Sequence, residues 1–464
     1  MKNNHTTSFS NPRRRFLQSA SGLLIPAVVP FAAQNAHAKL QKIANTAAGD
    51  DYRALVCVFM FGGNDANNMV VPRDPADHTR YAGPRGPLAI GRDQLLSVKP
   101  TNVQGREFGF HPSMTGIQTL FNAGKAAVMA NVGTLAQPLT KAQYNAGNGQ
   151  RPTNLFSHSD QQFLWNTAVA DNSLRSGWGG RLGDRVAAMN QSGSLTTCMS
   201  VAGNSTFLSG DTIRSFPVSP SGQFGLDFYE NGTETQPLST GIQKLLGQSA
   251  SRVNIMDGVW LDILSGAITN QKQISAALNS ASALTTVFPD TGLGQAMRMI
   301  ARLIVARGAF GAKRQVFFAA IGGFDTHGDD QTQRQNELLG EVSGAMTALY
   351  NATAEINMAE NVTAFTASDF NRNFVSNGKG SDHAWGSHHL MVGGAVKGNA
   401  MYGTFPTQIV DGPDDVGKGT WIPTTSVDQY AATMANWFGV TGADLNAVFP
   451  NLSRFPVANL GFML

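Results

Sequence analysis

Short apolar runs that end in paired glycines are the feature that most constrains the fold of this chain. Residues 54–61 read ALVCVFMF and stop at Gly62-Gly63, and residues 315–321 form a similar run that stops at Gly322-Gly323. An apolar run without polar alternation is typical of a strand that is covered on both faces of its sheet. These runs therefore indicate strands at the centre of a sheet with helices on both sides.

Predicted helices alternate with the predicted strands along the chain. Further strands are predicted at residues 126–132, 197–201, 361–367 and 389–396, and helices at residues 112–122, 159–168, 240–283, 293–307, 331–359 and 428–438. Such alternation predicts an α/β protein, a three-layer α/β/α sandwich with a largely parallel central sheet and with helical and loop insertions. The Ser-, Gly- and Pro-rich residues 203–240 are expected to form a surface excursion.

The first 38 residues have the pattern of an export signal. Three arginines at residues 13–15 precede Phe16-Leu17, an apolar stretch follows, and residues 36–38 read AHA, a small-x-small cleavage pattern. This segment resembles a twin-arginine signal, which implies passage through the Tat translocon, cleavage near Ala38 and a periplasmic or exported mature protein. The apolar stretch is short and contains two prolines, so we expect no stable membrane span in the mature protein.

The net positive charge of the chain comes from the basic residues of this segment. The formal charge is +3, and removal of Lys2 and the three arginines leaves 30 basic against 31 acidic residues. No basic run remains, which argues against a nucleic-acid partner. We expect a linker at residues 39–50 and one domain over residues 51–464, with a probable insertion at residues 203–290.

Cysteine is rare in this chain. Cys57 and Cys198 are its two cysteines, and no C-x-x-C pair is present. Cys57 lies in an apolar run and is expected to be a buried thiol, although a disulfide with Cys198 stays open for an exported protein.

Polar clusters follow several of the predicted strands. Asp65, Asp325 and Asp369 each come at or just after a strand end, and carboxylates that converge on one edge of a sheet would repel one another. Seven histidines remain after residue 38, and five belong to the polar clusters: His158, His327, His383, His388 and His389. A divalent cation would relieve the repulsion, and mixed Asp and His ligands favour Zn²⁺ or Mn²⁺, with Mg²⁺ or Ca²⁺ if carboxylates dominate.

Each cluster also has a purely structural interpretation. Ser157 and Asp160 are spaced as a capping box for the helix that follows them. Asp369 could pair with Arg372, and Asp65 could close a turn after the glycines. These interpretations stay open at the level of the sequence.

The clusters occur in an order that resembles a known family. Its motifs correspond here to GGNDANN, FSHSDQQ, GWGGR, GGFDTHGD, SDFNR, GSDHAWGSHH and MVGGAVKG, spread from about residue 51 to the end of the chain. They resemble the bacterial family called domain of unknown function 1501, which is similar to the alkaline phosphatase superfamily and its sulfatases. The resemblance implies an alkaline phosphatase-like fold and a site for one or two divalent ions.

The resemblance also implies roles for individual residues. The expected metal ligands are Asp65, Asp325, His327, Asp369, Asp382, His383 and His388. Ser157 is the expected nucleophile, with Ser159 as the alternative. Arg372 is expected to bind the anionic group of a substrate, with Arg181 or Asn64 as alternatives. Phe370 stands where the superfamily pattern has histidine, and the spacing from Asp325 to His327 is shorter than in that pattern.

Two functions from different classes are compatible with these features. The order of the clusters favours an exported, metal-dependent hydrolase that acts on a small-molecule phosphate or sulfate ester. The altered ligand pattern favours a non-catalytic exported metal-binding or scaffold protein of the same fold. The chain has no GxGxxG or haem-attachment motif that would favour an oxidoreductase.

Overall fold

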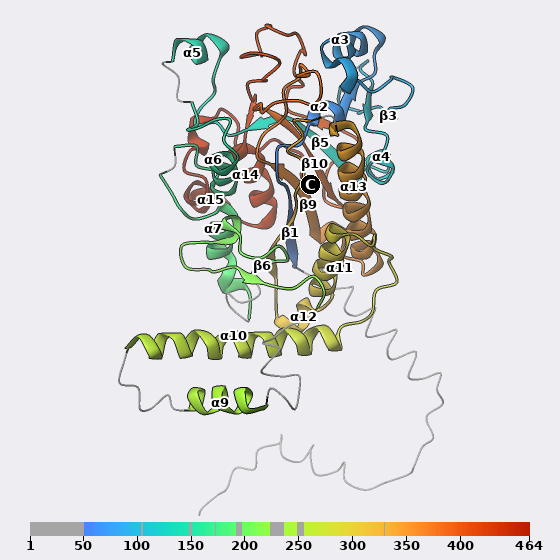
Figure 1. Cartoon of the computed structure of the whole chain (residues 1–464). Coiled ribbons are helices and arrows are strands. Elements are labelled where there is room, and N and C mark those ends of the chain that lie inside the picture. The colour runs from blue at the N-terminus through green and yellow to red at the C-terminus, as the bar shows by residue number, and fades with distance from the viewer. Residues whose placement is uncertain are drawn as a thin grey trace, which may run out of the picture. The chain divides into compact units, whose positions relative to one another are not determined.

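A largely parallel sheet lies at the centre of the structure (Figure 1). The computed structural model describes residues 51–103, 105–147, 151–171, 173–191, 197–222, 236–247, 255–328 and 330–464. The predicted signal at residues 1–38 and the linker at residues 39–50 lie outside these ranges, as do parts of the predicted insertion. The strands of the central sheet in this part of the chain are β1 (Arg53–Met60), β5 (Ala126–Gly133), β6 (Cys198–Ser200), β7 (Phe216–Pro217), β8 (Arg314–Ile321), β9 (Val362–Ser368), β10 (Ser387–Gly393), β11 (Met401–Tyr402) and β12 (Thr425–Ser426).

The order of the strands is β11-β5-β10-β9-β1-β8-β6-β7, with β12 paired to β5. Strand β10 runs antiparallel to both of its neighbours, whereas β1 is parallel to β8 and to β9. The pairings of β6, β7, β11 and β12 are parallel as well. The predicted class, an α/β fold with a largely parallel sheet, is therefore confirmed.

The side chains of β1 alternate between the two faces of the sheet, so that apolar side chains lie on both faces. A layer of helices covers each face. Val56 and Val58 belong to one apolar core, and Leu55 and Cys57 belong to the other. The first core contains side chains of α4 (Thr115–Asn122), α11 (Gly292–Val305) and α13 (Gln331–Glu355). The second core contains side chains of α6 (His158–Thr167), α7 (Trp178–Val186), α14 (Val427–Phe438) and α15 (Gly442–Val448). Figure 1 shows these two sets of helices on opposite sides of the sheet.

Several smaller elements complete the described residues. Strands β2 (Val70–Pro72), β4 (Phe108–Phe110) and β3 (Leu96–Val98) form a separate small antiparallel sheet in that order. The remaining α-helices are α2 (Ala66–Met69), α3 (Pro75–Arg85), α5 (Lys141–Ala146), α9 (Gln236–Gly247), α10 (Ile255–Ser280) and α12 (Arg307–Phe310). No helix in the described ranges is both long enough and apolar enough to cross a membrane.

Part of the predicted surface excursion packs into the core instead. Phe207 and Leu208, in a short 3-10 turn, are fully buried, and the ring of Phe207 lies 4.7 Å from that of Trp178. The prediction rested on the local Ser and Gly content. Burial of the two large apolar side chains outweighed it, since each buried side chain stabilises the fold by roughly 1.5–3 kcal/mol. Cys57 and Cys198 are both buried free thiols, and burial raises the pKa of each.

The turn after β1 has no room for a side chain. Gly62 has φ +113°, and a Cβ atom there would lie 2.3 Å from the backbone nitrogen of Asp325. Its own N–H donates to Asp369 Oδ2 at 3.2 Å, and its carbonyl accepts from Arg372 at 3.2 Å. Glycine at this position therefore lets three strand ends approach one another closely.

Gly62→Ala should destabilise the protein by at least about 1–3 kcal/mol, because it combines a strained backbone with a steric overlap. Gly322→Ala is the matched control, since a Cβ there meets nothing within 4 Å and the backbone lies outside the left-handed region. The control should change stability by less than about 1 kcal/mol. Urea unfolding followed by tryptophan fluorescence measures both variants, and equal effects would contradict this account of the turn.

Candidate metal centre

Three strand ends meet at one edge of the central sheet. In the parallel pairings, Met60 of β1 is opposite Ile321 of β8 and Ser368 of β9. The segments that leave these strands carry Asp325 and Asp369, and the first turn of α6 places His158 beside both of them. Residues that are far apart in the sequence thus reach the same place, the carboxyl edge of the sheet.

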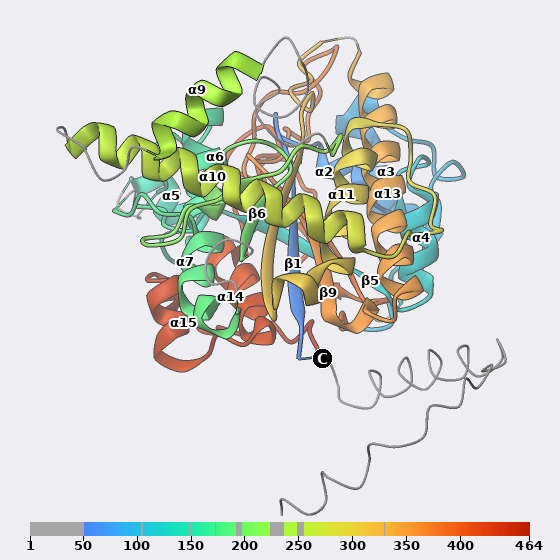
Figure 2. The same ribbon diagram turned by 90° about the horizontal axis from the view of Figure 1, so that it is seen from below.

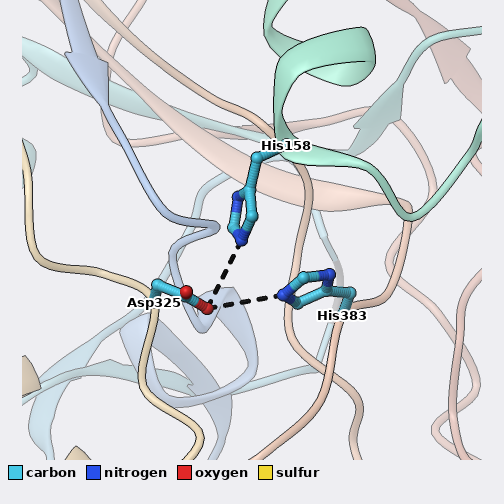
Figure 3. A group of neighbouring side chains, drawn as sticks. All are labelled: His158, Asp325 and His383. Carbon is cyan, nitrogen blue, oxygen red and sulfur yellow. Dashed lines mark hydrogen bonds and ion pairs between the residues drawn. The ribbon is translucent and has the colours of Figure 1, made fainter.

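Three imidazoles surround one carboxylate oxygen at this edge. Asp325 Oδ1 lies 3.4 Å from His158 Nε2, 3.1 Å from His327 Nε2 and 3.4 Å from His383 Nε2. The Nε2 atoms of His327 and His383 are 2.9 Å apart. Figure 3 shows the rings of His158 and His383 pointing toward Asp325 from different segments.

The opposite nitrogen of each ring faces an oxygen acceptor. His158 Nδ1 lies 2.7 Å from Asp369 Oδ2, and His327 Nδ1 lies 3.2 Å from Asp382 Oδ1. His383 Nδ1 lies 2.8 Å from the carbonyl oxygen of Phe156. With hydrogens on the three Nδ1 atoms, which face these oxygen acceptors, the neutral rings would have their lone pairs on Nε2. Those lone pairs would face the Asp325 carboxylate, which is also an acceptor, and repel it.

A cation between these atoms would resolve this repulsion. His158, Asp325 and His383 each offer one ligand atom, and the three atoms lie within 4.8 Å of one another. His158 Nε2 is buried and makes no hydrogen bond. Ligands of a tetrahedral zinc ion at 2.0–2.1 Å are about 3.3 Å apart, close to the separations from Asp325. The donor set of this centre therefore fits a divalent metal ion, and His327 is a neighbouring further donor.

The surroundings tune the charge of the centre. The hydrogen bond with Asp369 raises the pKa of His158, whereas burial lowers the pKa of His383. Burial opposes ionisation of Asp325, but Arg372 and the neighbouring imidazoles hold the pKa of its carboxyl below the usual value. The Asp325 side chain is 49% exposed, so an ion from solvent could reach the charged carboxylate.

Arg372 is in direct contact with the centre. Its buried guanidinium donates to Asp325 Oδ1 at 3.0 Å, to the carbonyl of Gly62 at 3.2 Å and to the carbonyl of Ser381 at 2.6 Å. The sequence left a pair between Arg372 and Asp369 open, and the structure pairs Arg372 with Asp325 instead. Arg372 thus fixes a candidate ligand, and its predicted contact with substrate stays a prediction.

Ser157 caps helix α6. Its hydroxyl donates to Asp160 Oδ2 at 2.6 Å, accepts from the Asp160 N–H and lies 3.2 Å from Ser159 Oγ. Ser157 is therefore confirmed as a helix cap, but the capping box is not formed, because the Ser157 N–H donates to the carbonyl of Asn154. The roles of Ser157 and Ser159 as nucleophiles stay predictions, and in this arrangement the hydroxyl of Ser157 is engaged within its own helix turn.

Two predicted metal ligands have other partners in the structure. Asp65 is buried in an ion pair with Arg85 of α3, and Gln331 donates to the same Asp65 oxygen at 2.6 Å. His388 lies inside β10, where its Nδ1 accepts from the backbone N–H of Asn131 at 3.0 Å and burial lowers its pKa to about 3. The predicted ligands Asp325, His327, Asp382 and His383 are brought together, and Asp369 joins them through His158.

His158 is the residue that the sequence interpretation missed as a candidate ligand. The motif FSHSDQQ was interpreted through its serines, as a helix cap and a nucleophile. A histidine at the first position of a helix that starts at the sheet edge was the available signal. Gln162, one turn further along α6, also contacts the centre, because it donates to Asp369 Oδ2 at 2.8 Å.

The fold and this cluster define an α/β/α protein with a histidine- and aspartate-lined site at the carboxyl edge of its sheet. The chain belongs to the family described as "Protein of unknown function (DUF1501)", whose model matches residues 52–447. The predicted family membership is therefore confirmed. A search of curated proteins finds no match.

Among solved structures, the chain is similar to PsFucS1 sulfatase from Pseudoalteromonas sp., with 9% identity over 89% of this chain and 72% of that chain and a TM-score of 0.36. It is also similar to Ps i-CgsB in complex with k-i-k-neocarrahexaose, with 9% identity over 86% and 74% of the two chains and a TM-score of 0.34. Similarities this distant carry no argument about the activity of this chain.

Arg85→Met should destabilise the protein by about 3–5 kcal/mol, because it leaves the Asp65 carboxylate buried without its partner. Arg80→Met, on the same helix, is the control, since Arg80 pairs with Asp77 in an exposed ion pair worth about 0–1 kcal/mol. The double variant Asp65→Asn/Arg85→Met should recover part of the loss. Urea unfolding measures all three variants, and a mild effect of Arg85→Met alone would refute a charged, buried pair.

Proposed function

We propose that this chain is a metal-dependent, hydrolase-like protein that acts on phosphate or sulfate esters at the centre formed by His158, Asp325 and His383. The observation that carries the proposal is the convergence of three Nε2 atoms on Asp325 Oδ1, each ring being fixed by an acceptor on its far nitrogen. A centre of this kind with a solvent-exposed side is suited to reactions as well as to binding.

A divalent ion bound here would supply Lewis-acid polarisation of an ester oxygen and a lower pKa for a bound water. The protein supplies the orientation. Asp369 and Asp382 fix two of the imidazoles, and Arg372 fixes the Asp325 carboxylate. Such outer contacts decide where the ligand atoms point and how basic they are.

An anionic substrate agrees with the charges around the centre. The amino end of α6, a ten-residue helix, begins at His158, and helix amino ends favour anionic groups. The order of the sequence motifs, which resembles that of the alkaline phosphatase superfamily, supports phosphate or sulfate esters as the substrate class.

One ion with nitrogen-rich ligands is the proposed occupancy. Imidazole nitrogen suits Zn²⁺, whereas Mg²⁺ and Ca²⁺ prefer oxygen, and a mixed set of His and Asp ligands adds Mn²⁺ as the second choice. Asp65, the acid that the sequence offered for a second ion, is neutralised by Arg85. A single ion of Zn²⁺ or Mn²⁺ is therefore the proposed cofactor.

A second candidate function, metal binding without turnover, is favoured by the state of Ser157. Its hydroxyl caps α6 and donates to Asp160, so in this arrangement it is engaged within its own helix turn. In a non-catalytic protein, the same centre would bind metal or fix the sheet edge. Only turnover separates the two functions, because metal content would be the same in both.

Elemental analysis of the purified protein should find about one equivalent of Zn or Mn per chain, and His158→Gln should lose it. His78→Gln is the control, since His78 lies outside the centre and contacts the carbonyl of Ile90. Asp369→Asn should weaken metal binding roughly 10–100-fold through the orientation of His158. Absence of metal from the wild-type protein and from its reconstituted form would rule out the centre.

Turnover on a panel of aryl phosphate and sulfate esters should accompany the bound metal and should be lost with chelator and in His158→Gln. Bound metal without turnover on any member of the panel would support the non-catalytic candidate instead.

We propose further that the protein is exported with the twin-arginine signal at residues 1–38 and acts in the periplasm or outside the cell. Replacement of the arginines at residues 13–15 by lysine should retain the full-length precursor in the cytoplasm. Cell fractionation with immunoblotting measures this, and unchanged export of the lysine variant would disprove the use of this pathway.

A further inference from the structure

A cavity of small-molecule size lies away from the candidate metal centre. Its volume is about 550 Å³, and it is lined by one face of α11 and by the segment that joins α10 to α11. This volume is within the range of roughly 300–1,000 Å³ that is usual for ligand pockets. None of the residues of the candidate metal centre lines it.

The segment between α10 and α11 forms a wall of the cavity, and α13 holds this segment in place. Glu355, at the end of α13, accepts hydrogen bonds from the backbone N–H groups of Thr285 at 2.7 Å and Thr286 at 2.9 Å, and from the Thr286 hydroxyl at 2.7 Å. Leu284 and Phe288 of the same segment pack against the core. Figure 2 shows this connection passing α13 on its way from α10 to α11. The cavity is therefore formed without a ligand.

Two arginines of α11 line this cavity. Arg298 and Arg302 are four residues apart and thus lie on one side of the helix, where like charges destabilise it. Within the part of the chain that the structure describes, neither arginine forms an ion pair with a carboxylate. Two nearby acids are engaged elsewhere, because Asp290 accepts from Gln295 at 3.2 Å and Glu341 accepts from the N–H of Leu293 at 2.8 Å.

The rest of the lining is mixed in character. Leu278, Leu284 and Phe288 contribute apolar surface, and Thr286 and Gln295 contribute polar groups. A bare inorganic ion would use the two arginines but would leave the apolar wall in contact with water. An organic molecule with one anionic group would use both parts of the lining.

We propose that this cavity binds a small organic anion whose phosphate or carboxylate group contacts Arg298 and Arg302 and whose carbon body lies against Leu284 and Phe288. The anion relieves the repulsion between the two guanidinium groups, and the wall fixed by Glu355 supplies the apolar contact. This site does not depend on the proposed hydrolase function, because it shares no residue with the metal centre.

Isothermal titration calorimetry of the full mature protein with hexyl phosphate and with hexanoate tests the site. At least one of them should bind saturably with 1:1 stoichiometry, and the better one identifies the anionic group. Acetate, inorganic phosphate and hexanol should each bind at least tenfold more weakly, since each lacks one of the two parts. Equal binding of the small ions and the hexyl compounds would overturn the proposal.

Arg298→Gln/Arg302→Gln should reduce the affinity for the better probe at least tenfold, and Arg298→Gln alone, at an exposed position, should reduce it by a smaller factor. Arg185→Gln is the control, since Arg185 is an exposed arginine that pairs with Asp444 outside the cavity. It should bind the probe as the wild type does. Unchanged binding in the Arg298→Gln and double variants, or no saturable binding of either probe to the wild type, would refute the site.

Discussion

The parallel pairing of β1 with both β8 and β9 is the constraint on which the candidate metal centre depends. It brings the ends of three strands to one edge, so that the segments after Met60, Ile321 and Ser368 leave the sheet side by side. Gly62 then allows the backbone of the first segment to touch that of the second. Without this close approach, Asp325 and Asp369 could not share His158 as a partner.

Charge balance explains why so many ionisable groups can lie at this edge. Each buried acid has its own cationic or hydrogen-bonding partner: Asp65 has Arg85, and Asp369 has His158 and Gln162. Arg372 is fully buried and neutralises Asp325, the acid that remains open to solvent. A buried charge without a partner costs several kcal/mol, so these pairs are a condition of folding as well as of function.

The local chemistry of the rings follows from this scaffold. Oxygen acceptors at three Nδ1 atoms orient three Nε2 atoms toward the same carboxylate. Such an arrangement has an unfavourable electrostatic energy when empty of protons or cations, and it becomes favourable when a cation binds. The orientation of the candidate ligands therefore comes from the residues that contact them. The sequence alone showed the acids and histidines but not these contacts.

The sequence by itself determined the layers of this protein, and the tertiary structure decided the roles of its polar residues. Apolar runs such as residues 54–61 predict buried strands because burial on both faces leaves no polar position, and those strands were found with their ends shifted by at most three residues. Short elements such as α2 and the small sheet of β2, β3 and β4 were not predicted, because runs of three or four residues are too short to show a hydrophobic period. The gathering of Asp325, His327 and His383 was foreseeable from their positions after or near strand ends. Three other features could not be foreseen: the ion pair of Asp65 with Arg85, the burial of His388 and the position of His158. The function of a charge or a lone pair depends on its neighbours, and only the folded chain brings these neighbours into contact.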